Sequence, residues 1–172
     1  MTAMETVREE VLRRLDEAGI SAMAAYSRSW AQEQEEAVLA VSICGCESAA
    51  AGLGAYLGER YDEETAVWQE EYGQRCELTV ALDAYSPRTA GALACETVLE
   101  RAHDVLLRSS DGGIRAMEMK WEAVCWDADS GMFLQKGRLA CSVYLIAAVE
   151  EETGLLLDFR LKGVPYHEHS ST

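Results

Sequence analysis

Residues 75–108 decide the fold, and they read RCELTVALDAYSPRTAGALACETVLERAHDVLLR. The first eleven alternate between apolar and polar side chains, with Leu78 and Val80 on the inner side, which is typical of a strand with one buried face. Ser86-Pro87 then predicts a helix start, because Ser suits the N-cap and Pro suits the first helical position. The helix is expected to run to about Arg108, with an apolar stripe of Ala92, Cys95, Leu99, Ala102 and Leu106 widened by Val98 and Val105.

The rest of the chain predicts strands on both sides of this helix. Between 114 and 126 we expect Met117, Met119 and Trp121 on one face and Glu118, Lys120 and Glu122 on the other. The expected elements are a helix over 2–18 ended by Gly19, a strand over 36–46, a strand within the small-residue stretch 48–58, a hairpin of 114–126 and 132–149 with its turn at 127–131, and a closing strand over 155–161. Strands interrupted by one good helix indicate an α+β fold, with a mainly antiparallel sheet and the N-terminal and central helices packed on one face.

The length and composition predict one domain over residues 1–172. With 172 residues and 49% hydrophobic content, the chain has enough apolar surface for a single core. We divide it into an N-terminal helix over 1–18, an α+β core over 36–164 and a flexible tail over 165–172. The segment 20–34 has no clear pattern.

The charge excludes several classes of partner. Thirty acidic residues against fifteen basic ones give a net charge of −15, which disfavours specific nucleic-acid binding and anionic membranes. The N-terminus is too charged for a signal peptide, and the longest apolar candidate, 139–149, is too short to span a membrane. We therefore expect the protein to fold in the cytoplasm where it is made.

No catalytic or cofactor site is expected. The three histidines include only one outside the tail, His103, which we interpret as a surface residue. An enzyme using Glu118 and Glu122 beside Trp121 is the alternative, and it would require a deep pocket lined by these residues. The alternating pattern opposes it, because it places the acids on the other face from Trp121.

The six cysteines lie within apolar segments, and we expect buried free thiols. Cys44-Gly-Cys46 and His167-Glu-His169 could together supply a zinc ligand set, but neither spacing matches a paired-ligand loop. We expect no metal and no cofactor.

The acid-rich segment 59–72 is the best candidate for an interaction site. It reads as a protruding loop or arm, and either it is draped over the core or it forms an interface. Trp and Tyr are the residue types that anchor protein interfaces, and acids at the rim give specificity. The candidate interaction residues are Tyr61, Asp62, Glu63, Glu64, Trp68, Glu70, Glu71 and Tyr72.

Three stretches together resemble a known family. They are YGQRCELTVALDAYSP over 72–87, the helix that follows, and DADSGMFLQKGRL over 127–139. They resemble tail terminator and tail-completion, or head–tail joining, proteins of long-tailed phages, of the type found in prophages of Gram-positive bacteria. The similarity in order of elements covers roughly 36–164.

This resemblance implies a virion structural protein with no catalytic residue. Such a subunit closes into a ring, typically a hexamer, that caps the tail tube and joins it to the neck. Its partners would be other copies of itself, the tail tube protein and a neck protein, while DNA passes through an acidic bore without specific binding. It would occupy the host cytoplasm during assembly and then the virion tail. The alternatives are another neck or connector component, or an acidic protein-interaction domain unrelated to phages, such as a regulatory partner that mimics DNA.

Overall fold

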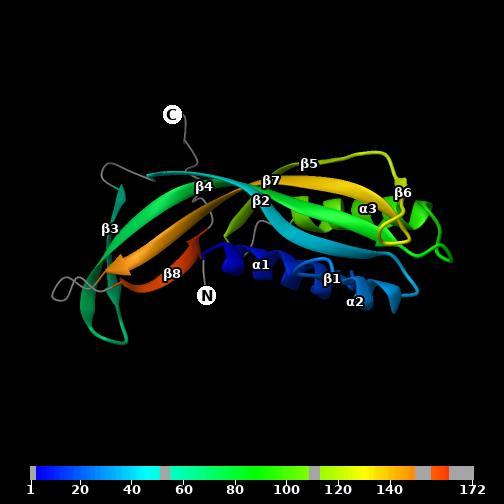
Figure 1. The fold of residues 1–172 in the computed structure, drawn as a ribbon. Coiled ribbons are helices and arrows are strands. Elements are labelled where there is room, and N and C mark those ends of the chain that lie inside the picture. The colour runs from blue at the N-terminus through cyan, green and yellow to red at the C-terminus, as the bar shows by residue number, and fades with distance from the viewer. Residues whose placement is uncertain (1–2, 51–54, 109–112, 150–155, 163–172) are drawn as a thin grey trace, which may run out of the picture.

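The computed structural model describes residues 3–50, 55–108, 113–149 and 156–162 (Figure 1). In chain order the elements are α1 (Ala3–Glu17), β1 (Ala22–Met23), α2 (Arg28–Gln32), β2 (Val38–Ala50), β3 (Tyr56–Asp62), β4 (Val67–Ser86), α3 (Leu93–Arg108), β5 (Ile114–Trp121), β6 (Cys125–Asp127), β7 (Met132–Val149) and β8 (Leu156–Lys162). They form an eight-stranded sheet in which the short β1–β2 pair is parallel and the remaining pairs are antiparallel. The predicted α+β class, with a mainly antiparallel sheet, is confirmed.

A long two-stranded ribbon of β4 and β7 runs through the whole sheet. The two strands pair without a register shift from Glu70 opposite Val149 to Ser86 opposite Phe133. On one edge of the ribbon β4 pairs with β2 and, further along, with β3; on the other edge β7 pairs with β5, β6 and then β8. Every other strand except β1 is therefore anchored to this ribbon.

The sheet has two parts, which we call the body and the arm. The body carries α1 and α3 on one face, over β2, β5 and the adjoining halves of β4 and β7. The arm consists of β3, β8 and the ends of β4 and β7, over 67–74 and 144–149, and extends past the helices (Figure 1). The sheet is thus covered by helices along only part of its length.

The core lies between the helices and the sheet of the body. Val7, Val11 and Leu15 of α1, four residues apart on one face of the helix, are buried. In α3 the buried residues are Cys95, Val98, Leu99, Ala102 and Leu106. They pack on the inner side chains of β4, which follow the predicted alternation, and of β7. Each such large side chain removed from water contributes about 1.5–3 kcal/mol to stability.

Gly137 of β7 allows α3 to approach the sheet closely. A Cβ at this position would lie 2.8 Å from the carbonyl oxygen of Leu82 and 3.0 Å from Cδ2 of Leu99. The space that any other side chain would fill is thus occupied by Leu99 of α3. By contrast, a Cβ at Gly45 of β2 would meet Thr79 Cβ at 3.5 Å, an ordinary contact.

Gly137→Ala is expected to lower the free energy of unfolding by about 1–3 kcal/mol, because the added methyl group pushes Leu99 and the backbone of β4 away. Gly45→Ala is the matched control and should change stability by less than about 0.5 kcal/mol. Urea denaturation followed by circular dichroism measures both. Equal effects of the two variants would contradict the close approach of α3 at Gly137.

The predicted start of the central helix is wrong. Ser86 does not cap α3, which begins at Leu93. Instead the Ser86 side chain is buried, and its hydroxyl donates to the carbonyl oxygen of Gly91 at 2.7 Å. Gly91 has a φ of +85°, a left-handed conformation that interrupts a helix, so 87–91 forms a turn that separates the strand from α3.

The predicted face of β5 is also wrong in part. A β-bulge between Ala116 and Glu118 makes Met117 the extra residue, so Met117 is 48% exposed while Met119 is buried. Trp121 keeps the face of Met119 and lies edge-on to His103 of α3 with ring centroids 5.9 Å apart. His103 therefore contacts an aromatic ring, where the sequence suggested only a surface residue.

Three predicted strands have wrong bounds: the one over 114–126 is divided into β5 and β6, the one over 75–85 begins at Val67 as β4, and the one over 36–46 continues to Ala50 as β2. The turn at 127–131 is confirmed, since the Ser130 N–H donates to Asp127 Oδ2 at 3.0 Å and Gly131 has a φ of +69°. Segment 20–34, unassigned from the sequence, contains β1 and α2. Within 48–58, β2 ends at Ala50, 51–54 lie outside the described residues, and β3 begins at Tyr56. The predicted tail over 165–172 also lies outside them.

The expectation of buried free thiols is confirmed for three cysteines and wrong for three. All six are free; Cys76, Cys95 and Cys141 are buried, whereas Cys44, Cys46 and Cys125 are exposed. Cys44 lies at a β-bulge between Ile43 and Gly45, and Cys125 lies in the short strand β6. Burial raises the pKa of the Cys95 and Cys141 thiols to about 11.

Thiol labelling should follow this division. We expect a maleimide at neutral pH to modify Cys44 and Cys125 rapidly in the folded protein, and Cys95 and Cys141 only after unfolding, because both access and the thiolate fraction are low at the buried positions. Peptide mass spectrometry of native and urea-treated samples reads out each site. Rapid native labelling of Cys141 would contradict the packing of α3 on β7.

Candidate protein-interaction site

The predicted interaction segment is a β-hairpin. The interpretation of 59–72 as a loop is wrong, because β3 and β4 pair from Tyr56 opposite Tyr72 to Asp62 opposite Val67. The interpretation as an arm describes it better, since this hairpin extends past the helices (Figure 1). The pairing gives the segment two faces with different side chains.

One face of the arm is aromatic. Tyr61 and Trp68 stand opposite each other with ring centroids 5.3 Å apart, and Tyr56 and Tyr72 do the same at 5.6 Å. Trp68 is 55% exposed, Tyr61 46% and Tyr56 42%. We call the residues Tyr56, Glu59, Tyr61, Trp68, Glu70 and Tyr72 the aromatic face, since the pairing register places all six on the same side.

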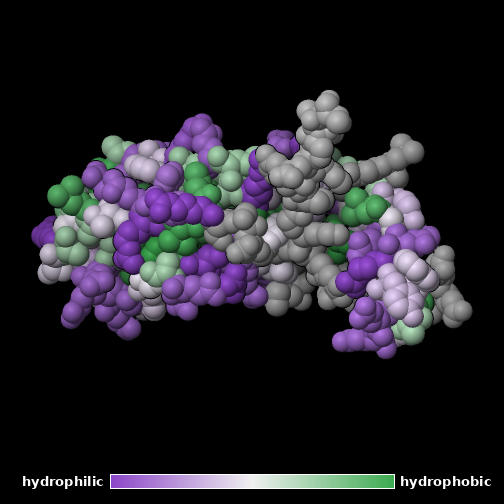
Figure 2. All heavy atoms as spheres, turned by 180° about the vertical axis from the view of Figure 1, so that it is seen from behind, coloured by the Kyte–Doolittle hydropathy of each residue, from purple (hydrophilic) through white to green (hydrophobic). Residues whose placement is uncertain are grey.

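Two carboxylates lie between the aromatic pairs. Glu59 is directly opposite Glu70 in the ladder. Glu70 Oε2 accepts a hydrogen bond from the Tyr72 hydroxyl at 2.6 Å, which orients it within the face. In Figure 2 this end of the molecule, at the right, mixes strongly hydrophilic surface with surface of intermediate hydropathy. The face thus combines aromatic and acidic groups.

The opposite face of the hairpin is held by polar pairs. Arg60 forms an ion pair with Glu71 at 3.4 Å, and Gln69 Nε2 donates to Asp62 Oδ2 at 3.1 Å. Near the base of the arm, Leu57 lies over Gly73, where a Cβ would come within 2.5 Å of its Cδ1. These contacts lie on the side of the hairpin away from the aromatic face and support the strand pairing.

Asp62 also shapes the turn at the tip. Its Oδ1 accepts hydrogen bonds from the backbone N–H of Glu64 at 2.9 Å and of Thr65 at 3.5 Å, which lowers the pKa of the Asp62 carboxyl. Ala66 closes the turn with a φ of +57°, a conformation that a residue with a Cβ adopts at a cost of about 1 kcal/mol. The tip therefore depends on one carboxylate and contains one strained residue.

The structure divides the eight predicted site residues into three groups. Tyr61, Trp68, Glu70 and Tyr72 share the aromatic face. Asp62 and Glu71 support the hairpin from within, as described above. Glu63 and Glu64 are exposed at the tip of the turn.

Two members of the aromatic face, Tyr56 and Glu59, were missed as site residues. Glu59 is the first residue of the acid-rich segment, and Tyr56 lies before it. The sequence alone does not indicate which residue of the neighbouring strand lies opposite either of them. Pairing across a tight turn is the signal that could identify them. If the turn is at 62–67, two residues lie opposite each other when their numbers sum to 129. This rule pairs Glu59 with Glu70 and Tyr61 with Trp68. A bulge at Leu57 then brings Tyr56 opposite Tyr72.

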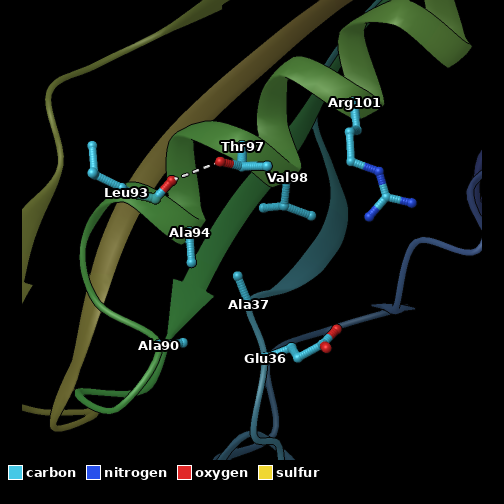
Figure 3. Close-up of a pocket in the computed structure, with 8 residues that line it drawn as sticks. All are labelled: Glu36, Ala37, Ala90, Leu93, Ala94, Thr97, Val98 and Arg101. Carbon is cyan, nitrogen blue, oxygen red and sulfur yellow. Dashed lines mark hydrogen bonds between the residues drawn. The ribbon is translucent and has the colours of Figure 1, made fainter.

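A second feature is a hollow beside α3 (Figure 3). It has a volume of about 310 Å³ and is lined by Glu36, Ala37, Ala90, Leu93, Ala94, Thr97, Val98 and Arg101. The Arg101 guanidinium donates to the carbonyl oxygens of Ala18 and Gly19 at 3.2 and 3.3 Å, so it ties α3 to the end of α1. Leu93, 74% exposed, lies at its rim.

The residues of the alternative enzyme hypothesis are placed differently from its requirement. Glu118 pairs with Lys120 at 2.9 Å on exposed side chains, and the Glu122 carbonyl oxygen accepts from Gln135 Nε2. The hollow beside α3 and the two that adjoin β2 have linings that include neither Trp121 nor these acids. The pocket that this hypothesis requires is therefore not among them.

The zinc alternative is not assembled among the described residues. Cys44 Sγ donates to the Thr79 carbonyl oxygen at 3.4 Å, whereas burial and the neighbouring Cys76 raise the pKa of the Cys46 thiol. His167 and His169 lie outside the described residues. Within the described ranges no group of three or more His, Cys, Asp and Glu side chains is placed to hold a metal ion.

Ala66→Gly is expected to stabilise the arm by roughly 0.5–1 kcal/mol, because glycine adopts a positive φ without steric cost. Hydrogen exchange of the amides in β3 and in 67–72, followed by NMR, measures the stability of the hairpin directly. Ala128→Gly, in an exposed turn without a positive φ, is the matched control and should not stabilise. Faster exchange in Ala66→Gly would contradict the strained turn.

Comparison with known protein families gives no match for this sequence, and comparison with curated protein sequences gives none either. In the described residues no helix is both long and apolar enough to cross a membrane.

Proposed function

We propose that this chain is a virion assembly protein of the tail terminator kind, which forms a ring, caps a tail tube and joins it to the neck. The observation that carries the proposal is the aromatic face of the arm, where the sheet extends beyond its helices and exposes Trp68, Tyr61 and Tyr56. Contiguous exposed aromatic surface of this type marks protein-interaction sites.

The shape of the molecule supports an assembly role. A subunit that closes a ring and also contacts a tube or neck protein needs separate patches, for its neighbouring copies and for that other protein. The body carries two further exposed apolar side chains, Leu93 at the start of α3 and Trp126 in β6, and β6 lies at the end of the molecule opposite the arm (Figure 1). Trp126 is held by Phe133, 5.1 Å away, and by the Arg88 guanidinium 4.7 Å above its ring.

The stretches that carry the family resemblance form one unit in space. Residues 72–86 of the first stretch lie in β4, residues 132–139 of the last stretch begin β7, and these two strands pair with each other. The helix between them, α3, packs on both through Leu99 and Cys95. The resemblance thus concerns a contiguous part of the body and supports the proposal at the level of architecture.

The assembly state of the purified protein tests the proposal. We expect light scattering coupled to size-exclusion chromatography to give a mass several times 18.9 kDa, and electron microscopy to show closed rings. Added to polymerising tail-tube subunits, the protein should end tube growth, and tubes without it serve as the control. A strict monomer at high concentration with no effect on tube length would contradict the proposal.

A further inference from the structure

The aromatic face has an arrangement that suits a positive charge. Along β4 its residues alternate as Trp68, Glu70 and Tyr72, and β3 repeats the order with Tyr61, Glu59 and Tyr56 opposite them. Rows two residues apart on a strand are about 6.6–6.8 Å apart. Two carboxylates therefore lie between two pairs of aromatic rings.

This carboxylate pair lacks a neutralising cation among the described side chains. Like charges directly opposite each other in a ladder are unfavourable. The basic residues of β3 and β4 belong to the other face: Arg60 pairs with Glu71, and Arg75 pairs with Glu77. The Tyr72 hydroxyl is the hydrogen-bond donor that the structure gives to Glu70. The negative charge of the face is thus directed to solvent.

The chemistry of the face identifies its occupant. Aromatic rings attract Arg and Lys through cation–π contact, and guanidinium groups pair with carboxylates while stacking on rings. Nucleic acid would be repelled by the same carboxylates, and a second copy with a net charge of −15 is a poor electrostatic match.

We infer that the aromatic face binds an extended, arginine- or lysine-bearing segment of a different protein, with the basic side chain between Glu59 and Glu70 and an apolar side chain on each aromatic pair. The inference rests on the proposed assembly role: that role requires the arm to contact a partner protein, and the inference specifies the chemistry of this partner. A segment with apolar residues two positions before and after the basic one matches the spacing of the rows.

A labelled heptapeptide tests the inference. The probe is acetyl-Thr-Leu-Thr-Arg-Thr-Leu-Thr-amide carrying fluorescein, and fluorescence anisotropy against the full-length protein measures binding. We expect Glu59→Gln with Glu70→Gln to weaken binding about tenfold or more, equivalent to about 1.4 kcal/mol. Trp68→Ala should weaken it to a similar degree. Replacing arginine by citrulline, which keeps the shape and removes the charge, should abolish most of the binding.

Matched variants separate the site from the general acidity of the chain. Glu63→Gln with Glu64→Gln removes the same charge at the tip of the hairpin, and Trp126→Ala removes an exposed Trp from the body. Both should change the affinity by less than about twofold. Equal weakening by the two double variants, or unchanged binding of the citrulline peptide, would overturn the inference.

The oligomeric state distinguishes this inference from the proposed function. We expect Trp68→Ala and the Glu59/Glu70 variant to keep the mass of the wild-type protein. A shift of Trp68→Ala from oligomer to monomer would show that a second copy occupies the face and would overturn the inference while leaving the ring in place. A monomeric wild-type protein that binds the peptide in the expected pattern would contradict the ring and support the inference.

Discussion

The unbroken ladder between β4 and β7 is the constraint on which the rest of the structure depends. Because the pairing from Glu70–Val149 to Ser86–Phe133 contains no bulge, the side-chain alternation set in the body continues unchanged into the arm. A slip of one residue would turn the core side chains of the body to solvent. The face that carries Leu78 and Val80 under the helices is therefore the same face that carries Tyr72, Glu70 and Trp68 beyond them.

Element lengths explain why the helices leave an arm uncovered. At a rise of 1.5 Å per residue, the 15 residues of α1 and the 16 of α3 give helices of about 22–24 Å. At 3.3 Å per residue, the 20 residues of β4 extend for about 66 Å. Helix α3 contacts β4, β5 and β7, helix α1 contacts β1 and β2, and the two helices contact each other. The strand β4 is therefore far longer than either helix, and its first part, over 67–74, extends past both as the arm (Figure 1).

The sequence predicts the elements of the body well because their patterns are local. The stripe in 95–106 and the alternation in 75–85 each require only their own side chains, and burial confirms them. The wrong predictions concern features that are determined by residues outside the local pattern. Ser86-Pro87 has the chemistry of a helix start, but Gly91 turns the chain first. The bulge at Met117 is defined by pairing with β7. The arm resembled a loop because both of its faces are polar or aromatic, so period-two alternation was hidden until pairing across the turn was known.

The arm is also where the sequence departs most from what stability alone favours. In the body, propensity, pattern and packing agree, which is typical of segments selected to fold. In the arm, Glu59 opposes Glu70, Ala66 adopts a left-handed conformation, and Tyr61 and Trp68 are roughly half exposed. Each of these three features lowers the stability of the unbound protein. Natural sequences keep such features mainly where function requires them. A bound cation would remove the repulsion between the carboxylates and cover the rings. The same residues that weaken the isolated arm would then contribute favourably to a complex.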